Sequence, residues 1–232
     1  APTGSGKTNL SMLLISEILK KRNDITKIFY VFPFISLITQ NISHFKENLQ
    51  LNNNEIIQIH SKASFQRSSS DDYYGDLKKN YIDALFVNFP FVLLSHIKFF
   101  NALTSNDKED NYLLHRIANS IVIIDELQSY NPSEWDKISY LINEYSESLN
   151  ITFVLMSATL PKISKLITKS SSDNFVYLVK NKEKYFNNPN FAQRVTFNFD
   201  YLDKNSFNFS NENLTEIVFK HSEDYFNEKH KV

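Results

Sequence analysis

The sequence predicts an α/β protein built on a parallel sheet with helices on both faces. Three observations support this prediction. Runs of β-branched and aromatic residues alternate with amphipathic segments of about 12 residues, a pattern typical of strands joined by helical crossovers. The chain opens on a glycine-containing segment, residues 1–8, that leads into an amphipathic segment. An apolar run over 121–124 ends in two acids, as a buried strand does where it reaches the edge of a sheet.

The first elements follow from periodicity and from residues that end helices and strands. A helix is predicted over 10–22, where leucine and isoleucine recur at helical spacing and three basic residues close the segment. A strand is predicted over 27–32, which is rich in β-forming residues and stops at Pro33. Further along, the sequence predicts a helix over 35–49, a strand over 55–60 and a polar loop over 64–76.

The same two periodicities predict the later elements. They are a strand over 84–87, a helix over 91–103, a loop over 104–111, a strand over 120–124, a helix over 132–145 and a strand over 151–156. Beyond Pro161 the regularity weakens. A strand over 195–201 and a helix over 214–226 complete the prediction.

Composition excludes several classes of function. The formal net charge of −1 argues against a protein that coats nucleic acid through a broadly basic surface. The chain has no cysteine, which excludes disulfides, thiol catalysis and cysteine-based zinc sites. The longest apolar run, residues 28–38, is interrupted by Pro33 and Ser36 and is too short to span a bilayer. We therefore expect a cytoplasmic protein with no membrane partner.

Residues 1–8, Ala-Pro-Thr-Gly-Ser-Gly-Lys-Thr, have the pattern of a phosphate-binding loop, with Ala1 in place of the usual first glycine. The chain has only three glycines, and two of them lie in this loop. Backbone N–H groups can surround phosphates there because no Cβ obstructs them. Lys7 would supply charge to the β- and γ-phosphates, and the Thr8 hydroxyl would ligate Mg²⁺. The predicted nucleotide-binding residues are Thr3, Gly4, Ser5, Gly6, Lys7 and Thr8.

A phosphate-binding loop ordinarily follows a buried strand, and no residues precede this one in the sequence. We therefore expect the chain to be a fragment that lacks the strand carrying the loop.

Two further motifs lie at the ends of predicted strands. Asp125 would hold Mg²⁺ through water, and Glu126 would orient and help deprotonate the water that attacks the γ-phosphate. An ordinary strand ending in a solvated acidic turn is the alternative. In the run 156–161, Met-Ser-Ala-Thr-Leu-Pro, the hydroxyls of Ser157 and Thr159 would bond to Glu126 or Gln128 and couple the ATP site to nucleic-acid binding.

In this order and spacing, the three motifs resemble the first RecA-like lobe of a superfamily 2 helicase. Residues 31–41 resemble the motif of that superfamily that touches the nucleic-acid backbone. The resemblance makes Pro33, Phe34, Gln40 and Asn41 candidate nucleic-acid-binding residues, although the start of a helix after Pro33 explains them structurally as well.

Within that superfamily the chain resembles the CRISPR-associated helicase–nuclease of type I systems. The runs that carry this likeness are 59–62, 114–128 and 156–161. The resemblance implies a RecA-like P-loop fold and ATP-dependent translocation along single-stranded DNA in the 3′-to-5′ direction, with a crRNA-guided surveillance complex as partner in antiviral defence. The family's nuclease is a histidine–aspartate metal domain, and the six histidines here include no pair with metal-site spacing. We therefore do not expect that domain within these residues, and it would be either fused to them in a longer chain or a separate protein.

The resemblance also divides the chain. Residues 1–190 would form the ATP-binding lobe, and residues 191–232 a connector and the start of a second RecA-like lobe. That second lobe brings arginines to the γ-phosphate, so we expect the fragment alone to be inactive.

Two alternatives remain. A superfamily 2 DNA or RNA helicase outside CRISPR would share the three motifs, but the Asp-Glu-Leu-Gln run and residues 114–120 argue against it. A non-catalytic nucleotide-binding scaffold would usually have lost at least one of Lys7, Thr8, Asp125 and Glu126, and all four are present.

Overall fold

The computed structural model describes residues 6–59 and 86–157, with shorter stretches at 175–181, 183–184, 187–189, 210, 215–216 and 218–219. The chain divides into two compact units, residues 1–186 and 187–232. The first contains all the strands described below. No helix in the described part of the chain is long and apolar enough to cross a membrane.

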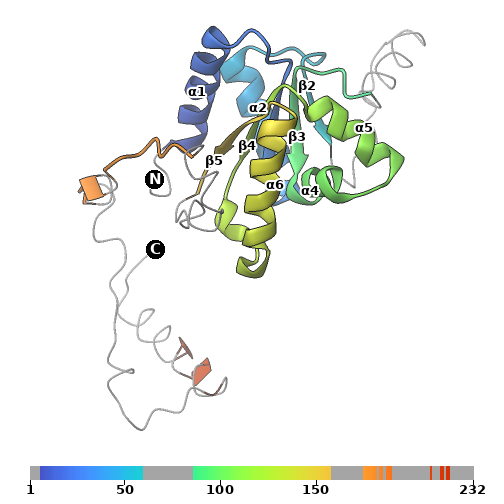
Figure 1. Cartoon of the computed structure of the whole chain (residues 1–232). Helices are drawn as coiled ribbons and strands as arrows, with labels where there is room; N and C mark the ends of the chain where they lie inside the picture. Colours follow the sequence, from blue (N-terminus) through green and yellow to red (C-terminus); the bar gives the residue numbers. More distant parts are fainter. Residues whose placement is uncertain are drawn as a thin grey trace, which may run out of the picture. The chain divides into compact units, whose positions relative to one another are not determined.

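A five-stranded sheet forms the centre of the first unit, with strand order β2-β3-β1-β4-β5 and parallel pairing between all described neighbours (Figure 1). The strands are β1 Lys27–Phe32, β2 Ile56–Ile59, β3 Phe91–Ser95, β4 Ser120–Ile124 and β5 Thr152–Leu155. The helices are α1 Lys7–Lys21, α2 Ile35–Leu49, α4 His96–Thr104, α5 Lys108–Ile117 and α6 Trp135–Ser148, with short 3₁₀ turns at Leu127–Ser129 and Pro132–Glu134. The predicted parallel α/β sheet is confirmed.

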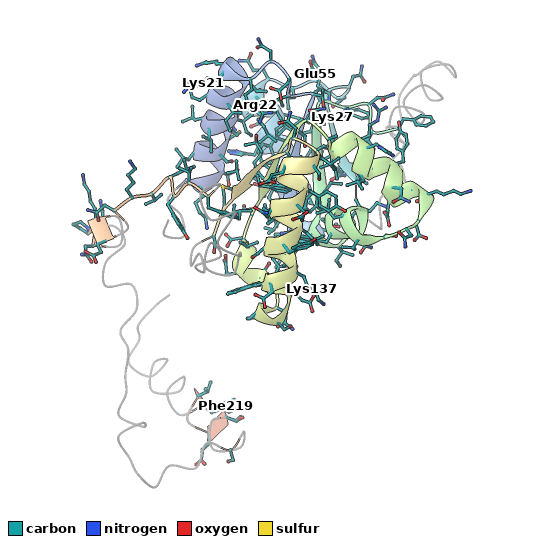
Figure 2. The ribbon with its side chains drawn as sticks, in the orientation of Figure 1. Lys21, Arg22, Lys27, Glu55, Lys137 and Phe219 are labelled. Carbon is teal, nitrogen blue, oxygen red and sulfur yellow. The ribbon has the colours of Figure 1, made fainter. Side chains whose placement is uncertain are left out.

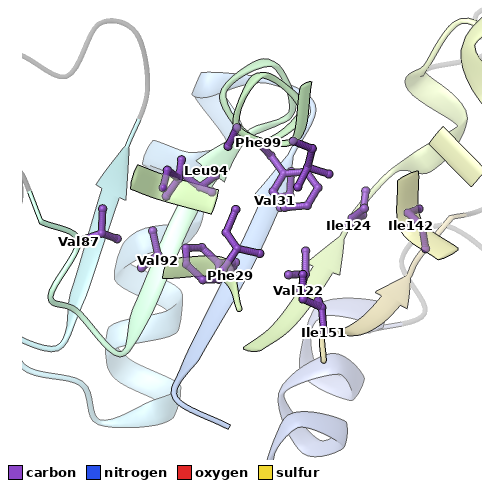
Figure 3. Packing of buried hydrophobic residues seen from close by; sticks show 14 of the residues in the cluster. Phe29, Val31, Val87, Val92, Leu94, Phe99, Val122, Ile124, Ile142 and Ile151 are labelled. Atoms are coloured by element: carbon purple, nitrogen blue, oxygen red, sulfur yellow. The ribbon is translucent and has the colours of Figure 1, made fainter. Parts of the chain in front are cut away.

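One face of the sheet packs against α4, α5 and α6. Alternate strand residues point to this face because successive side chains of a strand lie on opposite sides. Figure 3 shows part of this cluster. Its strand members include Phe29, Val31, Val92, Leu94, Val122 and Ile124, and its helix members include Phe99, Ile117, Ile138 and Ile142. These helices therefore cover the first apolar face of the sheet.

The intervening strand residues form a second core against α1 and α2. Met12 and Ile15 of α1 and Ile38 and Phe45 of α2 pack there on Tyr30, Phe32, Leu93, Ile121 and Ile123. The ring centroid of Phe45 lies 4.8 Å from that of Tyr30 and 5.2 Å from that of Phe91. Helices thus cover both faces, as the sequence predicts. Strands β3 and β4 are buried throughout, which explains why they read as continuous apolar runs.

Two predicted elements are wrong. Residues 86–87 of the predicted strand 84–87 form a turn, and the first half of the predicted helix 91–103 is strand β3. The run Phe91–Leu94 is apolar at every position, so periodicity cannot distinguish a helix from a strand there. Pairing with β1 and β2 on its two sides decides for the strand. Helix α4 starts only where the Ser95 hydroxyl accepts a hydrogen bond from the Lys98 N–H.

Other boundaries shift by a few residues. Helix α5 begins at Lys108, inside the predicted loop 104–111, and its first turn carries Glu109 and Asp110, which favour a helix N-terminus. Residues 132–134 form a 3₁₀ turn before α6 instead of its first turn. The predicted loop 64–76, the predicted strand 195–201 and most of the predicted helix 214–226 lie outside the described residues.

The two ends of the sheet differ in what they hold. Figure 2 shows Arg22, Lys27 and Glu55 together at the end where the strands begin. There the Arg22 guanidinium donates hydrogen bonds to Thr152 Oγ1 at 2.6 Å and to Asn150 Oδ1 at 2.8 Å. The Asn150 amide donates in turn to Asn119 Oδ1 at 2.9 Å. This clasp of Arg22, Asn119, Asn150 and Thr152 joins the end of α1 to the starts of β4 and β5. The phosphate-loop residues and the acidic pair lie at the opposite end.

Candidate nucleotide-binding site

The described part of the phosphate loop is its junction with α1. Gly6 caps the helix with φ 74° and ψ 30°, a left-handed conformation that favours glycine. The Gly6 carbonyl accepts the Leu10 N–H at 3.0 Å, so Lys7 and Thr8 occupy the first turn of the helix. Thr3, Gly4 and Ser5 lie outside the described residues.

An ion pair joins this turn to the acidic motif. Lys7 Nζ lies 3.1 Å from Glu126 Oε1, although the two residues are 119 positions apart in the chain. Their side chains are only 13% and 27% exposed, so the pair is partly shielded from solvent. The fold therefore brings the first and second sequence motifs into direct contact.

The backbone around Asp125 and Glu126 explains how the two acids reach this end of the sheet. The Asp125 N–H donates to the Val31 carbonyl at 3.0 Å, which extends the ladder between β4 and β1 by one residue. Glu126 then takes a left-handed conformation, φ 50° and ψ 49°, at a strain of about 1–3 kcal/mol. Its N–H donates to Asp125 Oδ1 at 2.9 Å. The strand thus ends sharply, and its two acids line one cavity.

The pKa values of the two carboxyls are shifted in opposite directions. Burial raises the pKa of Asp125, and the hydrogen bond from the Glu126 N–H only partly opposes that rise. Burial also acts to raise the pKa of Glu126, but hydrogen bonds from Gln128 and Lys7, together with the charge of Lys7, lower it overall. Glu126 is therefore held as a carboxylate at neutral pH.

A hydrogen-bonded chain links Glu126 to the third motif. The Gln128 amide donates to Glu126 Oε2, and its carbonyl oxygen accepts from the Ser157 hydroxyl. The Leu127 N–H also donates to the Met156 carbonyl at 3.1 Å, so the backbones of the two motifs are joined as well. The contact predicted between Ser157 and Gln128 is present. Thr159 lies outside the described residues.

His96 supports the same turn, and sequence reasoning missed it. Its Nε2–H donates to the Asp125 carbonyl across 3.1 Å. Its ring stacks on Tyr130 with centroids 4.1 Å apart and planes at 15°. Burial lowers the pKa of His96 to about 4, so the ring is neutral at physiological pH. A histidine placed directly after an apolar strand was the available signal, but that strand was itself predicted as a helix.

A cavity of about 610 Å³ lies between these groups, within the range of small-molecule sites. Its lining residues are Gly6, Lys7, Thr8, Asn9, Gln40, Asn41, His44, Asp125 and Glu126. Among the described residues no group of three or more acidic or histidine side chains is arranged to hold a metal. Mg²⁺ in nucleotide sites is instead bound through one or two carboxylates, phosphates and water. The Thr8 hydroxyl and the Asp125 carboxyl in one cavity fit that kind of donor set.

The four candidate nucleic-acid residues separate into two pairs. Pro33 and Phe34 lie where β1 gives way to α2, and the Phe34 side chain is 61% exposed. Gln40 and Asn41 lie further along α2 and line the cavity with Lys7. The Asn41 amide donates to the Leu37 carbonyl at 2.8 Å, within its own helix.

Comparisons with known proteins agree with this fold. The family model of the DEAD/DEAH box helicases matches residues 1–166. The fold is similar to that of T. fusca Cas3, the type I CRISPR helicase–nuclease, in its crystal structures with ATP and with ADP. The TM-scores are 0.54 and 0.55 at 20% identity, covering 72% and 74% of this chain. The chain spans only 19% of the length of Cas3. No curated protein is similar enough in sequence to count as a match.

Proposed function

Because the chain belongs to the DEAD/DEAH box helicase family, we propose that it is the ATP-hydrolysing lobe of a single-stranded DNA translocase acting in type I CRISPR interference. The observation that carries the catalytic part of this proposal is the 3.1 Å contact between Lys7 and Glu126. It joins a phosphate-binding cation to a proton acceptor in one cavity, which is the combination that NTP hydrolysis requires.

Each residue of the cavity takes one part of the reaction. The ammonium of Lys7 would move from Glu126 to the β- and γ-phosphates. Glu126 would then orient the attacking water and accept its proton. The lowered pKa keeps Glu126 ionised while Lys7 lies beside it, and the carboxylate would become more basic once the ammonium had moved to the phosphates. The left-handed turn at Glu126 keeps its side chain at the end of the sheet.

Thr8 and Asp125 would hold Mg²⁺, the first directly and the second through water. The ion would neutralise charge on the β- and γ-phosphates as the transition state develops. His96 would keep the Asp125 backbone in place through its hydrogen bond to the carbonyl.

Coupling to nucleic acid would run through Gln128. Its two hydrogen bonds connect Glu126 with Ser157, so a displacement of the Ser157–Thr159 segment would move the proton acceptor. Pro33, Phe34, Gln40 and Asn41 remain the candidates for contact with single-stranded DNA. Phe34 is the strongest of them, since an exposed aromatic ring offers a stacking surface for a base.

The CRISPR assignment rests on the likeness to the type I helicase–nuclease. Because the chain spans a fifth of Cas3, a crRNA-guided surveillance complex, a nuclease and 3′-to-5′ movement are proposals for the longer protein. The domain proposal is an ATP-binding lobe over 1–190 and a connector with the start of a second lobe over 191–232. The second candidate, a helicase outside CRISPR, is favoured by the family match, which does not itself specify CRISPR.

The test is ATP hydrolysis by the full-length protein, with single-stranded DNA, with RNA and with neither. We expect DNA to stimulate hydrolysis and Glu126→Gln to abolish it while ATP still binds. Glu17→Gln is the matched control, because Glu17 is an exposed residue of α1 that pairs with Lys20. Stimulation by RNA alone would favour the second candidate, and hydrolysis unaffected by Glu126→Gln would refute the catalytic assignment.

A further inference from the structure

A chain of three polar side chains joins α1 to α2 beside the cavity. His44 Nε2 lies 3.0 Å from Asn9 Oδ1, and the Asn48 amide lies 3.1 Å from His44 Nδ1. Asn48 Nδ2 is a donor, and it also donates to the His44 carbonyl at 2.7 Å. Nδ1 of His44 therefore accepts, and its Nε2–H donates to Asn9. The arrangement sets the orientation of the imidazole ring.

These three hydrogen-bonded side chains lie on a different side of α1 from the ion pair of Lys7 and Glu126. Lys7 and Asn9 are two positions apart in the helix, so their side chains project roughly 200° apart around its axis. Lys7 reaches Glu126, and Asn9 reaches His44 on α2. Both nevertheless line the same cavity. The cavity therefore extends around the first turn of α1, from a charged part to an uncharged part.

We infer that Asn9 and His44 bind the nucleoside, the ribose and base, of the nucleotide whose phosphates Lys7 holds. The inference rests on the proposed function. His44 uses the oxygen of the Asn9 amide, and the amide keeps two N–H donors for hydroxyl or base acceptors. The imidazole also presents an aromatic face on which a base can stack.

The alternative occupant of this part of the cavity is the backbone of a polynucleotide. Lysine and arginine supply most of the electrostatic affinity for a phosphate backbone, and Lys7 is the one lysine or arginine among the described lining residues. Asn9 and His44 provide an amide and an imidazole ring instead. Uncharged hydrogen-bonding groups of this kind match hydroxyls and base edges better than phosphates.

The experiment compares two ligands that share phosphates and differ in the nucleoside. In the full-length protein with Mg²⁺, the Kd for ATP and for inorganic triphosphate is measured by calorimetry for the wild type, His44→Ala and Asn9→Ala. We expect each substitution to weaken ATP binding about tenfold, the loss of one or two hydrogen bonds, and to leave triphosphate binding unchanged. Lys7→Ala should weaken both ligands. His115→Ala, in an exposed position on α5, is the matched control.

Three results would overturn the inference. ATP affinity unchanged in both variants would remove the two residues from the site. An equal loss for ATP and triphosphate would mean that they only support the phosphate loop. Weaker single-stranded DNA binding with unchanged ATP binding would assign them to the polynucleotide. Failure of the proposed function is separate, because it would leave ATP bound by the wild type but not hydrolysed in response to DNA.

Discussion

The ion pair between Lys7 and Glu126 sets two demands on the same ammonium. In the structure it pairs with Glu126, and in the proposed function it would also bind phosphate. A nucleotide would therefore have to compete with Glu126 for Lys7, and Gln128 would keep Glu126 oriented once Lys7 had moved. Single residues of this site consequently act through their partners, and their substitutions have specific expected effects.

Removing the cation should mainly affect affinity. Lys7→Ala is expected to raise the Kd for ATP by roughly 10- to 100-fold, because hydrogen bonds to charged groups contribute about 1.5–3 kcal/mol. Calorimetric titration with Mg·ATP measures the change. Lys20→Ala is the control, since Lys20 lies on the same helix, is 66% exposed and pairs with Glu17. Equal affinities in the wild type and Lys7→Ala would contradict the nucleotide site.

Removing the amide between Glu126 and Ser157 should mainly affect coupling. Gln128→Ala is expected to reduce DNA-stimulated ATP hydrolysis severalfold and to leave ATP affinity within about twofold. Ser157→Ala removes the hydrogen bond at the other end of the Glu126–Gln128–Ser157 link. The DNA-stimulated rate of the double variant should therefore be no lower than that of the less active single variant. Steady-state kinetics with and without single-stranded DNA measure this. Additive losses would show that the two residues act independently.

Much of the site was predictable at this scale, because its residues belong to short sequence motifs that occur in a fixed order along the chain. Lys7, Asp125 and Glu126 were predicted to face one site, and the structure brings them together. His96 and His44 were not predicted. Their placement depends on contacts with Asp125, Tyr130 and Asn9, which are 29, 34 and 35 positions away in the chain. These contacts join residues far apart in the chain, and the one local signal, His96 directly after an apolar run, lay in a segment predicted as a helix.

Among the elements, α2 depends on one aromatic anchor. Phe45 is fully buried against Tyr30, Phe32 and Phe91. Phe45→Ala should lower the free energy of unfolding by about 3–5 kcal/mol through lost burial and a cavity. Phe34→Ala, in the exposed residue just before the same helix, should change it by less than about 0.5 kcal/mol. Urea denaturation of both variants checks this. Similar losses of unfolding free energy in the two variants would contradict the role of Phe45 as the buried anchor of α2.

A partly buried ion pair joins α4 to α5. Lys98 Nζ lies 2.7 Å from Asp110 Oδ1, and its hydrogen bond holds the pKa of Asp110 below the usual range against the effect of burial. Lys98→Met should cost about 1–2 kcal/mol at pH 7. The exposed pair of Lys137 and Glu134 is the control, and Lys137→Met should cost about 0.5 kcal/mol or less.

The pH dependence of that pair follows from the sign of the shift. A carboxyl whose pKa is lower in the folded state stabilises the fold above its unfolded pKa of about 3.9. That contribution is lost as the pH falls through the folded pKa. The difference in Tm between the wild type and Lys98→Met should therefore be constant from pH 5 to 7 and shrink below about pH 4. A difference that stayed constant as the pH fell far below 4 would contradict an ionic contribution.

Strands were predictable where residues with definite roles bound the apolar run. Strand β1 was predicted at its observed limits because Pro33 ends it, and β4 because two acids follow it. Strand β3 has no such boundary at its carboxyl end, since its apolar residues continue into a helix with a similar pattern. Only the neighbouring strands distinguish the two, and their positions are a property of the folded chain.

For the molecule as a whole, the described cavity lacks one group that the proposed phosphoryl transfer would need. No arginine is found among the described residues that line the cavity. Arginines that stabilise charge on the γ-phosphate typically contribute about 10³–10⁵ in rate. We therefore expect residues 1–232 alone to hydrolyse ATP no faster than the Glu126→Gln variant of the full-length protein, with or without single-stranded DNA. Robust DNA-stimulated turnover by residues 1–232 would contradict the requirement for a second lobe.

The clasp around Arg22 has a practical consequence for experiments on this protein. It lies where the strands begin, whereas the cavity and the candidate DNA contacts lie where they end. Asn23, the exposed neighbour of Arg22, therefore offers an attachment point for a dye or a surface tether. A bead or a fluorophore fixed there would sit beside a hydrogen-bonded corner, at the end of the sheet away from the cavity and the proposed DNA contacts.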